Sequence, residues 1–213
     1  MSEDSPIIDP LLATVPSAPG DEPHVPREHK VGRILRDWVV VIAVALIAAL
    51  LVRVYVLQQF YISGPSMETT MFSNDRVLVN KLSYRLHDIH RGDVVVFDRV
   101  TMNGSSIAHD DLIKRVIGLA GESVEIRQCR VYINGNVLPE PYLPERDTTQ
   151  TDPTSRCRVV SMKAVDVPDG HVFVMGDNRP ESFDSRSFGA IPESLVVGRA
   201  FAVVWPLGRL TSL

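Results

Sequence analysis

Two side chains in this sequence have the chemistry of a nucleophile and its base. Ser66 stands in the turn Gly64-Pro65-Ser66-Met67, shortly after the only long apolar run. A serine hydroxyl is a poor nucleophile until a neighbouring group takes its proton. Lys114 lies in the apolar stretch Leu112–Ile117, and a lysine buried on such a strand loses hydration, which lowers its pKa. A neutral amine of that kind can accept the serine proton.

Each feature alone also has an ordinary explanation, because Gly-Pro-Ser is a common turn and strand alternation would point a lysine to solvent. The nucleophile elbow G-x-S-x-G is absent, since Glu68 stands where its second glycine would be. Histidine is the usual base, but the sequence gives no clear orienting carboxylate for His109 or His171. His87 and His90 have an i,i+3 spacing that suits a metal but lack a third ligand. We therefore expect no metal and no cofactor.

A polar loop, Gly176–Gly189, follows the strand-like segment Val172–Met175. Short polar side chains that bond to the backbone make such a loop rigid. It is either a charged surface loop or a support whose hydroxyls and ion pairs orient an active-site group. The residues alone leave both interpretations open.

The long apolar run predicts a membrane anchor. Every residue from Trp38 to Val52 is apolar, and after Arg53 the run resumes to Leu57. A helix of about 20 such residues crosses the hydrocarbon core of a bilayer. Basic residues within Arg27–Arg36 favour a cytoplasmic N-terminus and an extracytoplasmic remainder. An Ala-x-Ala pattern at 43–45 would suit a cleaved signal peptide, but no polar region follows it, which favours an uncleaved single-pass anchor over residues 33–57.

Composition assigns the remaining parts of the chain. Residues 1–30 contain six prolines and several acids, so we expect residues 1–32 to form a disordered cytoplasmic tail. A net charge of −4 gives no electrostatic reason to expect nucleic acid as a partner. The lipid bilayer is the first expected partner.

Residues 58–213 read as a β-rich extracytoplasmic domain, because short β-branched or alternating runs dominate it. The expected strands are 76–80, 93–97, 112–117, 123–126, 130–133, 159–164, 171–175 and 198–205. Asn134-Gly135 between two such runs predicts a type I′ hairpin. The expected fold class is mainly β, with coiled antiparallel sheets of barrel-like or sandwich-like form. Residues 136–158, rich in Pro, Glu, Asp and Thr, form a long excursion from it.

Cys129 and Cys157 both fall in the exported part, without a C-x-x-C motif or histidine pairing. A zinc site is therefore not expected. An oxidising compartment would permit a disulfide between them, and a domain of this size would also fold with two free thiols. The sequence leaves these two states open.

Taken together, the ordered motifs resemble the bacterial type I signal peptidases, membrane-anchored serine proteases with a Ser/Lys dyad. The resemblance covers nearly all of residues 33–205. Its motifs, in chain order, are the anchor, Ser63-Gly64-Pro65-Ser66-Met67, the stretches 75–81, 91–97 and 114–122, and the loop Gly176–Gly189. The five motifs that follow the anchor, in the family's order, are far more specific than any one of them.

The resemblance implies a role for each matched position. Ser66 matches the nucleophile, whose backbone N–H would donate to the oxyanion, and Lys114 matches the general base. Ser182 matches a serine that hydrogen-bonds the lysine amine, while Asp184 and Arg186 match a supporting ion pair. The expected substrates are secretory preproteins, cleaved at the bacterial cytoplasmic membrane after small residues at positions −1 and −3.

The substrate peptide is expected to bind as an added strand. Its register would be set by main-chain bonds near Tyr61–Gly64 and Asp111–Ile113. The residues expected to bind it are Tyr61, Ile62, Ser63, Leu112 and Ile113.

Two positions depart from the family pattern. Gly64 stands where one branch has a serine whose hydroxyl completes the oxyanion hole, which leaves the second donor undetermined. Thr69 replaces the usual proline of Ser-Met-x-Pro-Thr and should alter turn rigidity more than chemistry.

Three other classes fit less well. A catalytically silent anchored homologue would have lost the dyad. A sortase-like transpeptidase would need a reactive cysteine, and a self-cleaving repressor would carry a DNA-binding domain in place of the membrane span.

Overall fold

The computed structural model describes residues 28–103, 106–144 and 157–213. Residues 1–27, most of the predicted tail, lie outside this part, as do residues 145–156 of the predicted excursion. Helix α1 (Glu28–Tyr55) begins within the predicted tail, so residues 28–32 are helical. It ends two residues before the predicted end of the anchor, because Leu57 is already the first residue of a strand. Its segment Gly32–Arg53 has a mean hydropathy of 2.4, and none of its apolar window is buried against protein. By length and composition this helix could cross a membrane.

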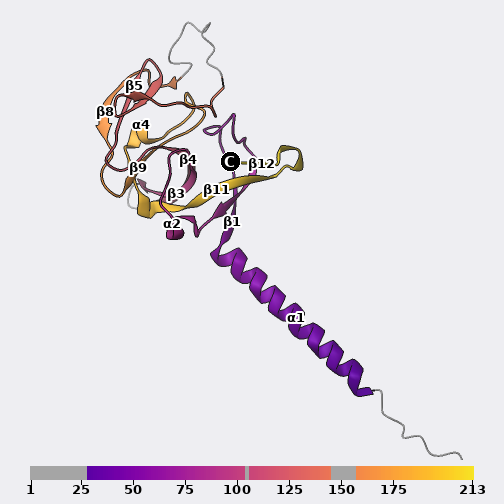
Figure 1. Cartoon of the computed structure of the whole chain (residues 1–213). Coiled ribbons are helices and arrows are strands. Elements are labelled where there is room, and N and C mark those ends of the chain that lie inside the picture. The colour runs from indigo at the N-terminus through magenta and orange to yellow at the C-terminus, as the bar shows by residue number, and fades with distance from the viewer. Residues whose placement is uncertain (1–27, 104–105, 145–156) are drawn as a thin grey trace, which may run out of the picture. The chain divides into compact units, whose positions relative to one another are not determined.

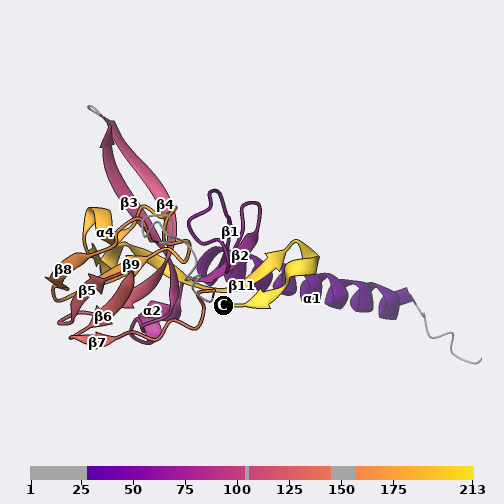
Figure 2. The same cartoon turned by 90° about the horizontal axis from the view of Figure 1, so that it is seen from above.

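The larger sheet has the strand order β1-β2-β11-β3-β4-β9-β10, with β12 beside β11, and every pairing is antiparallel. Figure 1 shows where β1, β3, β4, β9, β11 and β12 of this sheet lie. Its strands are β1 (Leu57–Tyr61), β2 (Arg76–Asn80), β3 (Val94–Asn103), β4 (Ser106–Gly118), β9 (His171–Met175), β10 (Ile191–Pro192), β11 (Val196–Trp205) and β12 (Thr211–Ser212). Figure 2 shows the outer halves of β3 and β4 projecting beyond the rest as a long hairpin. Both strands are longer than the sequence predicts, because the hairpin continues past the apolar segments.

The smaller sheet has the order β7-β6-β5-β8 and is also antiparallel. Its strands are β5 (Ser123–Arg127), β6 (Arg130–Ile133), β7 (Asn136–Val137) and β8 (Met162–Asp166). Asn134 and Gly135 have φ values of +50° and +81°, and Ile133 pairs with Asn136 across them. The predicted two-residue hairpin is therefore confirmed.

Short helices complete the fold, namely α2 (Ser83–Leu86), α4 (Ser185–Phe188), η1 (Glu193–Leu195) and η2 (Leu207–Arg209). Three groups of buried apolar residues form the core. One contains Ile62, Met67 and Met71, so the turn that carries Ser66 is fixed by apolar side chains on both sides. A second joins β9 to the smaller sheet through Phe173 and Met175. The prediction of a mainly β fold with antiparallel sheets is confirmed.

The structure differs from the predicted strand 159–164, because β8 begins only at Met162. Arg158 has a φ of +53°, and Cys157 forms a disulfide with Cys129 at a Cα–Cα distance of 5.6 Å. The chain therefore bends at this crosslink before it can extend as a strand. Of the two states that the sequence left open for these cysteines, a disulfide or two free thiols, the structure has the disulfide.

Candidate active site

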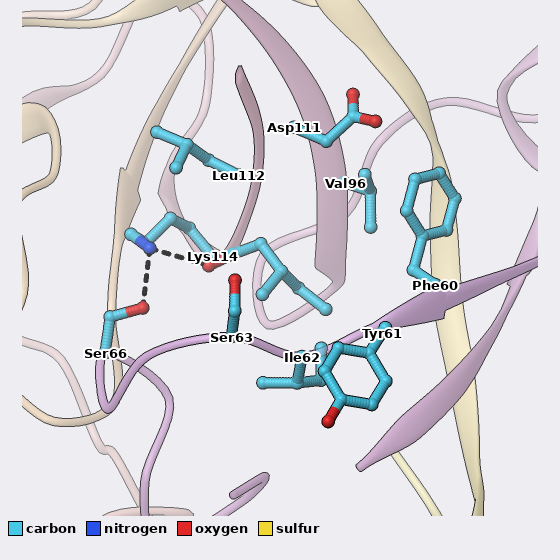
Figure 3. Close-up of a pocket in the computed structure, with 10 residues that line it drawn as sticks. Phe60, Tyr61, Ile62, Ser63, Ser66, Val96, Asp111, Leu112 and Lys114 are labelled. Atoms are coloured by element: carbon cyan, nitrogen blue, oxygen red, sulfur yellow. Dashed lines mark hydrogen bonds between the residues drawn. The ribbon is translucent and has the colours of Figure 1, made fainter. Parts of the chain in front are cut away.

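Ser66 and Lys114 meet although 48 residues separate them along the chain. Ser66 lies in the loop between β1 and β2, and Lys114 lies on β4. The Lys114 Nζ atom is 2.8 Å from Ser66 Oγ and 2.8 Å from the carbonyl oxygen of Ile113 (Figure 3). The amine therefore faces the hydroxyl, with its orientation held by the adjacent main chain.

Lys114 is only 3% exposed. It lies on a strand bonded to β3 on one side and β9 on the other, and β4 is buried continuously from Lys114 to Gly118. Desolvation lowers the pKa of the amine from 10.5 to about 8, against the charges of Asp184 and Asp177, which raise it. A neutral amine is thus available near neutral pH, and it can take a proton from the hydroxyl that it contacts.

The loop after β9 holds the Ser66 turn in place. The backbone N–H of Asn178 donates to the Ser66 carbonyl at 3.1 Å, and the Asn178 amide donates to the Pro65 carbonyl at 3.0 Å. A Cβ atom added at Gly176 would collide with the Ser66 carbonyl oxygen and lie 2.6 Å from the Ser182 Cβ. Only glycine lets this loop pack directly against the turn.

An ion pair lies directly behind this contact, formed by the predicted partners Asp184 and Arg186. Arg186 donates twice to the Asp184 carboxylate, at 2.8 and 2.7 Å, and both side chains are almost fully buried. Burial alone would raise the pKa of Asp184, but the hydrogen bonds and charge of Arg186 hold it below its ordinary value. Asp184 in turn accepts from the Gly176 N–H at 3.0 Å, so the pair fixes the residue that contacts Ser66.

Ser182 is 1% exposed and packs beside Gly176. Its hydroxyl helps to lower the pKa of Asp184, yet within the described residues it meets no partner at hydrogen-bond geometry. The bonds of the Lys114 amine go to Ser66 and Ile113 rather than to Ser182. The role of Ser182 in orienting the lysine stays a prediction.

A second buried ion pair, which the sequence analysis did not predict, lies next to the first. Arg115 donates to Asp177 at 2.9 and 2.7 Å, and Asp177 also accepts from the Thr70 hydroxyl. The Arg115 guanidinium stacks 4.1 Å from the ring centre of Tyr142, a residue in the described first part of the predicted excursion 136–158. The sequence places Arg115 beside Lys114, but strand alternation would put the two on opposite faces and hides this pairing.

All five residues predicted to bind substrate line one pocket with Ser66 and Lys114. Its volume is about 60 Å³, and its other lining residues are Phe60, Val96 and Asp111. Figure 3 shows the Ser63 hydroxyl pointing towards the space beside Lys114, and Ile62 lying below it. Val96 was not predicted, because it comes from β3, and its register with Ile113 on β4 appears only in the folded sheet.

Within the part of the chain that the structure describes, one edge of β4 has no strand partner beside this pocket. Residues 106–115 pair with β3, but the pairing with β9 on the other side covers only Arg115 to Gly118. The outer edge at Asp111–Ile113 therefore offers main-chain groups to a further strand. Such an edge can bind an extended peptide.

The expected oxyanion donor is not used by another hydrogen bond in the described part of the chain. The Ser66 N–H donates to no acceptor within the described residues, and Gly64, two residues earlier, has a φ of +98°. The space around Gly64 is open, with no atom within 4 Å of a Cβ added there. By contrast, His109 contacts Asp98 at 2.6 Å on the β3–β4 hairpin, and the side chain that contacts the Ser66 hydroxyl is Lys114.

Comparison with known proteins shows which family the chain belongs to. Residues 35–205 match the family model described as signal peptidase, peptidase S26. A probable signal peptidase I-2 from Synechocystis is 39% identical over 166 residues, which cover 78% of this chain and 71% of the relative. Signal peptidase IB from Staphylococcus aureus is 35% identical over 182 residues, covering 82% and 92%. A crystal structure of a signal peptidase I from Enterococcus faecalis aligns at 33% identity and a TM-score of 0.42, covering 53% of this chain and 97% of that one. The extent of the family match and the identity of these relatives show that the chain belongs to the signal peptidase I family of serine peptidases, peptidase S26.

Proposed function

We propose that this protein removes N-terminal signal peptides from secretory preproteins, with Ser66 as nucleophile and Lys114 as general base. The observation that carries the proposal is the 2.8 Å contact between a buried amine and the serine hydroxyl. A lysine whose pKa is lowered to about 8 has the proton affinity that this step needs.

The proposed reaction has two stages. Lys114 takes the Ser66 proton as Oγ attacks the scissile carbonyl, and the oxyanion that forms accepts from the Ser66 N–H. Lys114 then protonates the leaving amine as the carbon–nitrogen bond breaks, which leaves an acyl-enzyme on Ser66. A water molecule, deprotonated by the same amine, releases the signal peptide and restores the serine.

Substrate binding is proposed to use the unpaired edge of β4. An extended peptide would bond to Asp111–Ile113 on one side and pass Tyr61–Gly64 on the other, which sets the register of the scissile bond. A pocket of about 60 Å³ is of the size that suits a small side chain such as that of alanine. This size supports cleavage after small residues at −1 and −3, with Ile62, Leu112 and Ile113 providing apolar lining.

The proposed location follows from α1. As a single-pass anchor with a cytoplasmic N-terminus, it would leave Ser66 only 11 residues beyond the end of the helix at Tyr55. The site would then lie outside the bacterial cytoplasmic membrane, close to the outer leaflet, where signal peptides end.

The test compares Ser66→Ala and Lys114→Met with Lys163→Met, a control at an exposed lysine on β8. Each full-length protein is purified in detergent and given a preprotein with an Ala-x-Ala site. We expect the first two variants to lose activity by about 10³-fold or more with unchanged folding by circular dichroism, and the control to cleave normally. Normal cleavage by folded Lys114→Met would refute the assignment of the base.

A further inference from the structure

A second and larger pocket lies apart from the catalytic one and shares no residue with it. Its volume is about 320 Å³. It is formed where three parts of the chain meet, namely the end of α1, the β2–α2 segment, and η1 with the start of β11. Its polar and aromatic lining residues are Tyr55, Lys81, Tyr84, Arg85, Glu193 and Ser194.

The pocket carries two uncompensated cations. Neither Lys81 nor Arg85 forms an ion pair or a side-chain hydrogen bond within the described residues. The nearby acid Asp93 is already engaged, because it accepts from the Tyr84 hydroxyl at 3.0 Å and pairs with Arg199 at 3.0 Å. Glu193 is the single carboxylate in the lining, so the lining has a net positive charge.

The pocket lies at the end of the apolar helix. Tyr55 is the last residue of α1, two positions after the end of the apolar segment at Arg53. The Lys81 N–H donates to the Val56 carbonyl at 2.9 Å, which ties the cationic segment to the residue that follows the helix. If α1 spans the bilayer, the pocket lies at the level of the outer-leaflet headgroups, where tyrosine and basic side chains are favoured.

The surface around Lys81 and Arg85 is suited to the headgroup region of a bilayer. Leu86, next to Arg85 on α2, is 80% exposed, and Tyr55 is 65% exposed. Apolar side chains beside unpaired cations match the boundary between acyl chains and phosphates. A soluble phosphate would gain nothing from this apolar rim, so the surroundings favour a lipid.

We propose that this pocket binds the headgroup of an anionic phospholipid. Lys81 and Arg85 hold the phosphate diester, and Glu193 accepts hydrogen bonds from the hydroxyls of a glycerol headgroup. The proposal rests on the anchoring of α1 in the membrane and is independent of the chemistry at Ser66. The bound lipid fixes the β2–α2 segment against the outer leaflet.

The experiment uses the full-length protein in a neutral detergent and measures its thermal unfolding midpoint. The ligands are a short-chain phosphatidylglycerol, the matching phosphatidylcholine, and free glycerol phosphate. A ligand that binds only the folded protein raises the midpoint in a saturable way. We expect phosphatidylglycerol to do so, with much weaker effects from the other two.

The variant Lys81→Gln/Arg85→Gln should weaken the apparent affinity for phosphatidylglycerol by about tenfold or more, since each cation near an anionic lipid contributes roughly 1 kcal/mol. Its control is Arg130→Gln/Lys163→Gln, which removes the same charge from exposed positions on the smaller sheet and should bind as the wild type does. Ser194→Glu provides a second variant that leaves both cations in place and should abolish the shift by repelling the phosphate.

The failure of this proposal is distinguishable from that of the proposed function. Ser66→Ala should keep the lipid-induced shift while losing cleavage, and Lys81→Gln/Arg85→Gln should cleave a soluble peptide at the normal rate. An equal shift with phosphatidylcholine would overturn the proposal, as would retention of the shift in both pocket variants. An equal affinity for glycerol phosphate would replace the lipid with a soluble phosphate.

Discussion

Gly176→Ala should disable the candidate site by displacing Ser66, without touching either reacting side chain. Gly176 lies where the loop after β9 packs against the Ser66 turn, and it has ordinary negative-φ backbone, so alanine adds only steric bulk. The new methyl group would lie 2.6 Å from the Ser182 Cβ and closer still to the Ser66 carbonyl oxygen. Both neighbours, Ser182 and Ser66, belong to the candidate site.

The size of the effect follows from how far the turn must move. Ordinary van der Waals contact begins near 3.4 Å, so the two loops must separate by roughly 1 Å. Such a shift would stretch the 3.1 Å bond from the Asn178 N–H and the 2.8 Å contact between Ser66 and Lys114. A misplacement of about 1 Å in a catalytic geometry costs on the order of 10²-fold in rate.

The assay is the rate of peptide cleavage at saturating substrate, together with the thermal unfolding midpoint. The matched control is Gly198→Ala, whose new Cβ would lie 2.5 Å from the Asn80 carbonyl oxygen on β2, away from Ser66. Both variants should lose stability, but only Gly176→Ala should lose about 10²-fold in kcat. A kcat within twofold of wild type for folded Gly176→Ala would refute the argument that this glycine positions Ser66.

Two other predictions concern pH and the crosslink. With a pKa lowered to about 8, Lys114 is neutral in about a tenth of molecules at pH 7. The value of kcat/KM should therefore rise about tenfold per pH unit below pH 8 and level off above it. A flat profile between pH 6 and 8 would contradict the role of a desolvated Lys114 amine in the reaction. Reduction of the Cys129–Cys157 disulfide, or its replacement by Cys129→Ser/Cys157→Ser, should lower the free energy of unfolding by about 3.5 kcal/mol, because the bond closes a loop with a sequence separation of 28 residues. Urea unfolding measures the loss, and equal stability with and without the bond would show that the loop is fixed by other contacts.

Local patterns were enough for much of the fold. Strand β2, the hairpin at Asn134-Gly135 and the apolar run of α1 were predictable because side-chain period, turn chemistry and length act over neighbouring residues. The boundary of β8 was missed because a crosslink to a distant cysteine bends the chain at Cys157. That constraint leaves no trace in the local pattern.

The same distinction applies to the candidate site. The order of motifs identified Ser66 and Lys114 by resemblance, while the residues by themselves favoured a solvent-facing lysine. Only the tertiary structure buries Lys114, because the turn that carries Ser66 packs against its amine on a face that local alternation expects to be solvated. The Arg115–Asp177 pair likewise joins residues 62 positions apart. Periodicity and turn chemistry are short-range properties and are written in the sequence, whereas desolvation and ion pairing depend on which distant segments pack together.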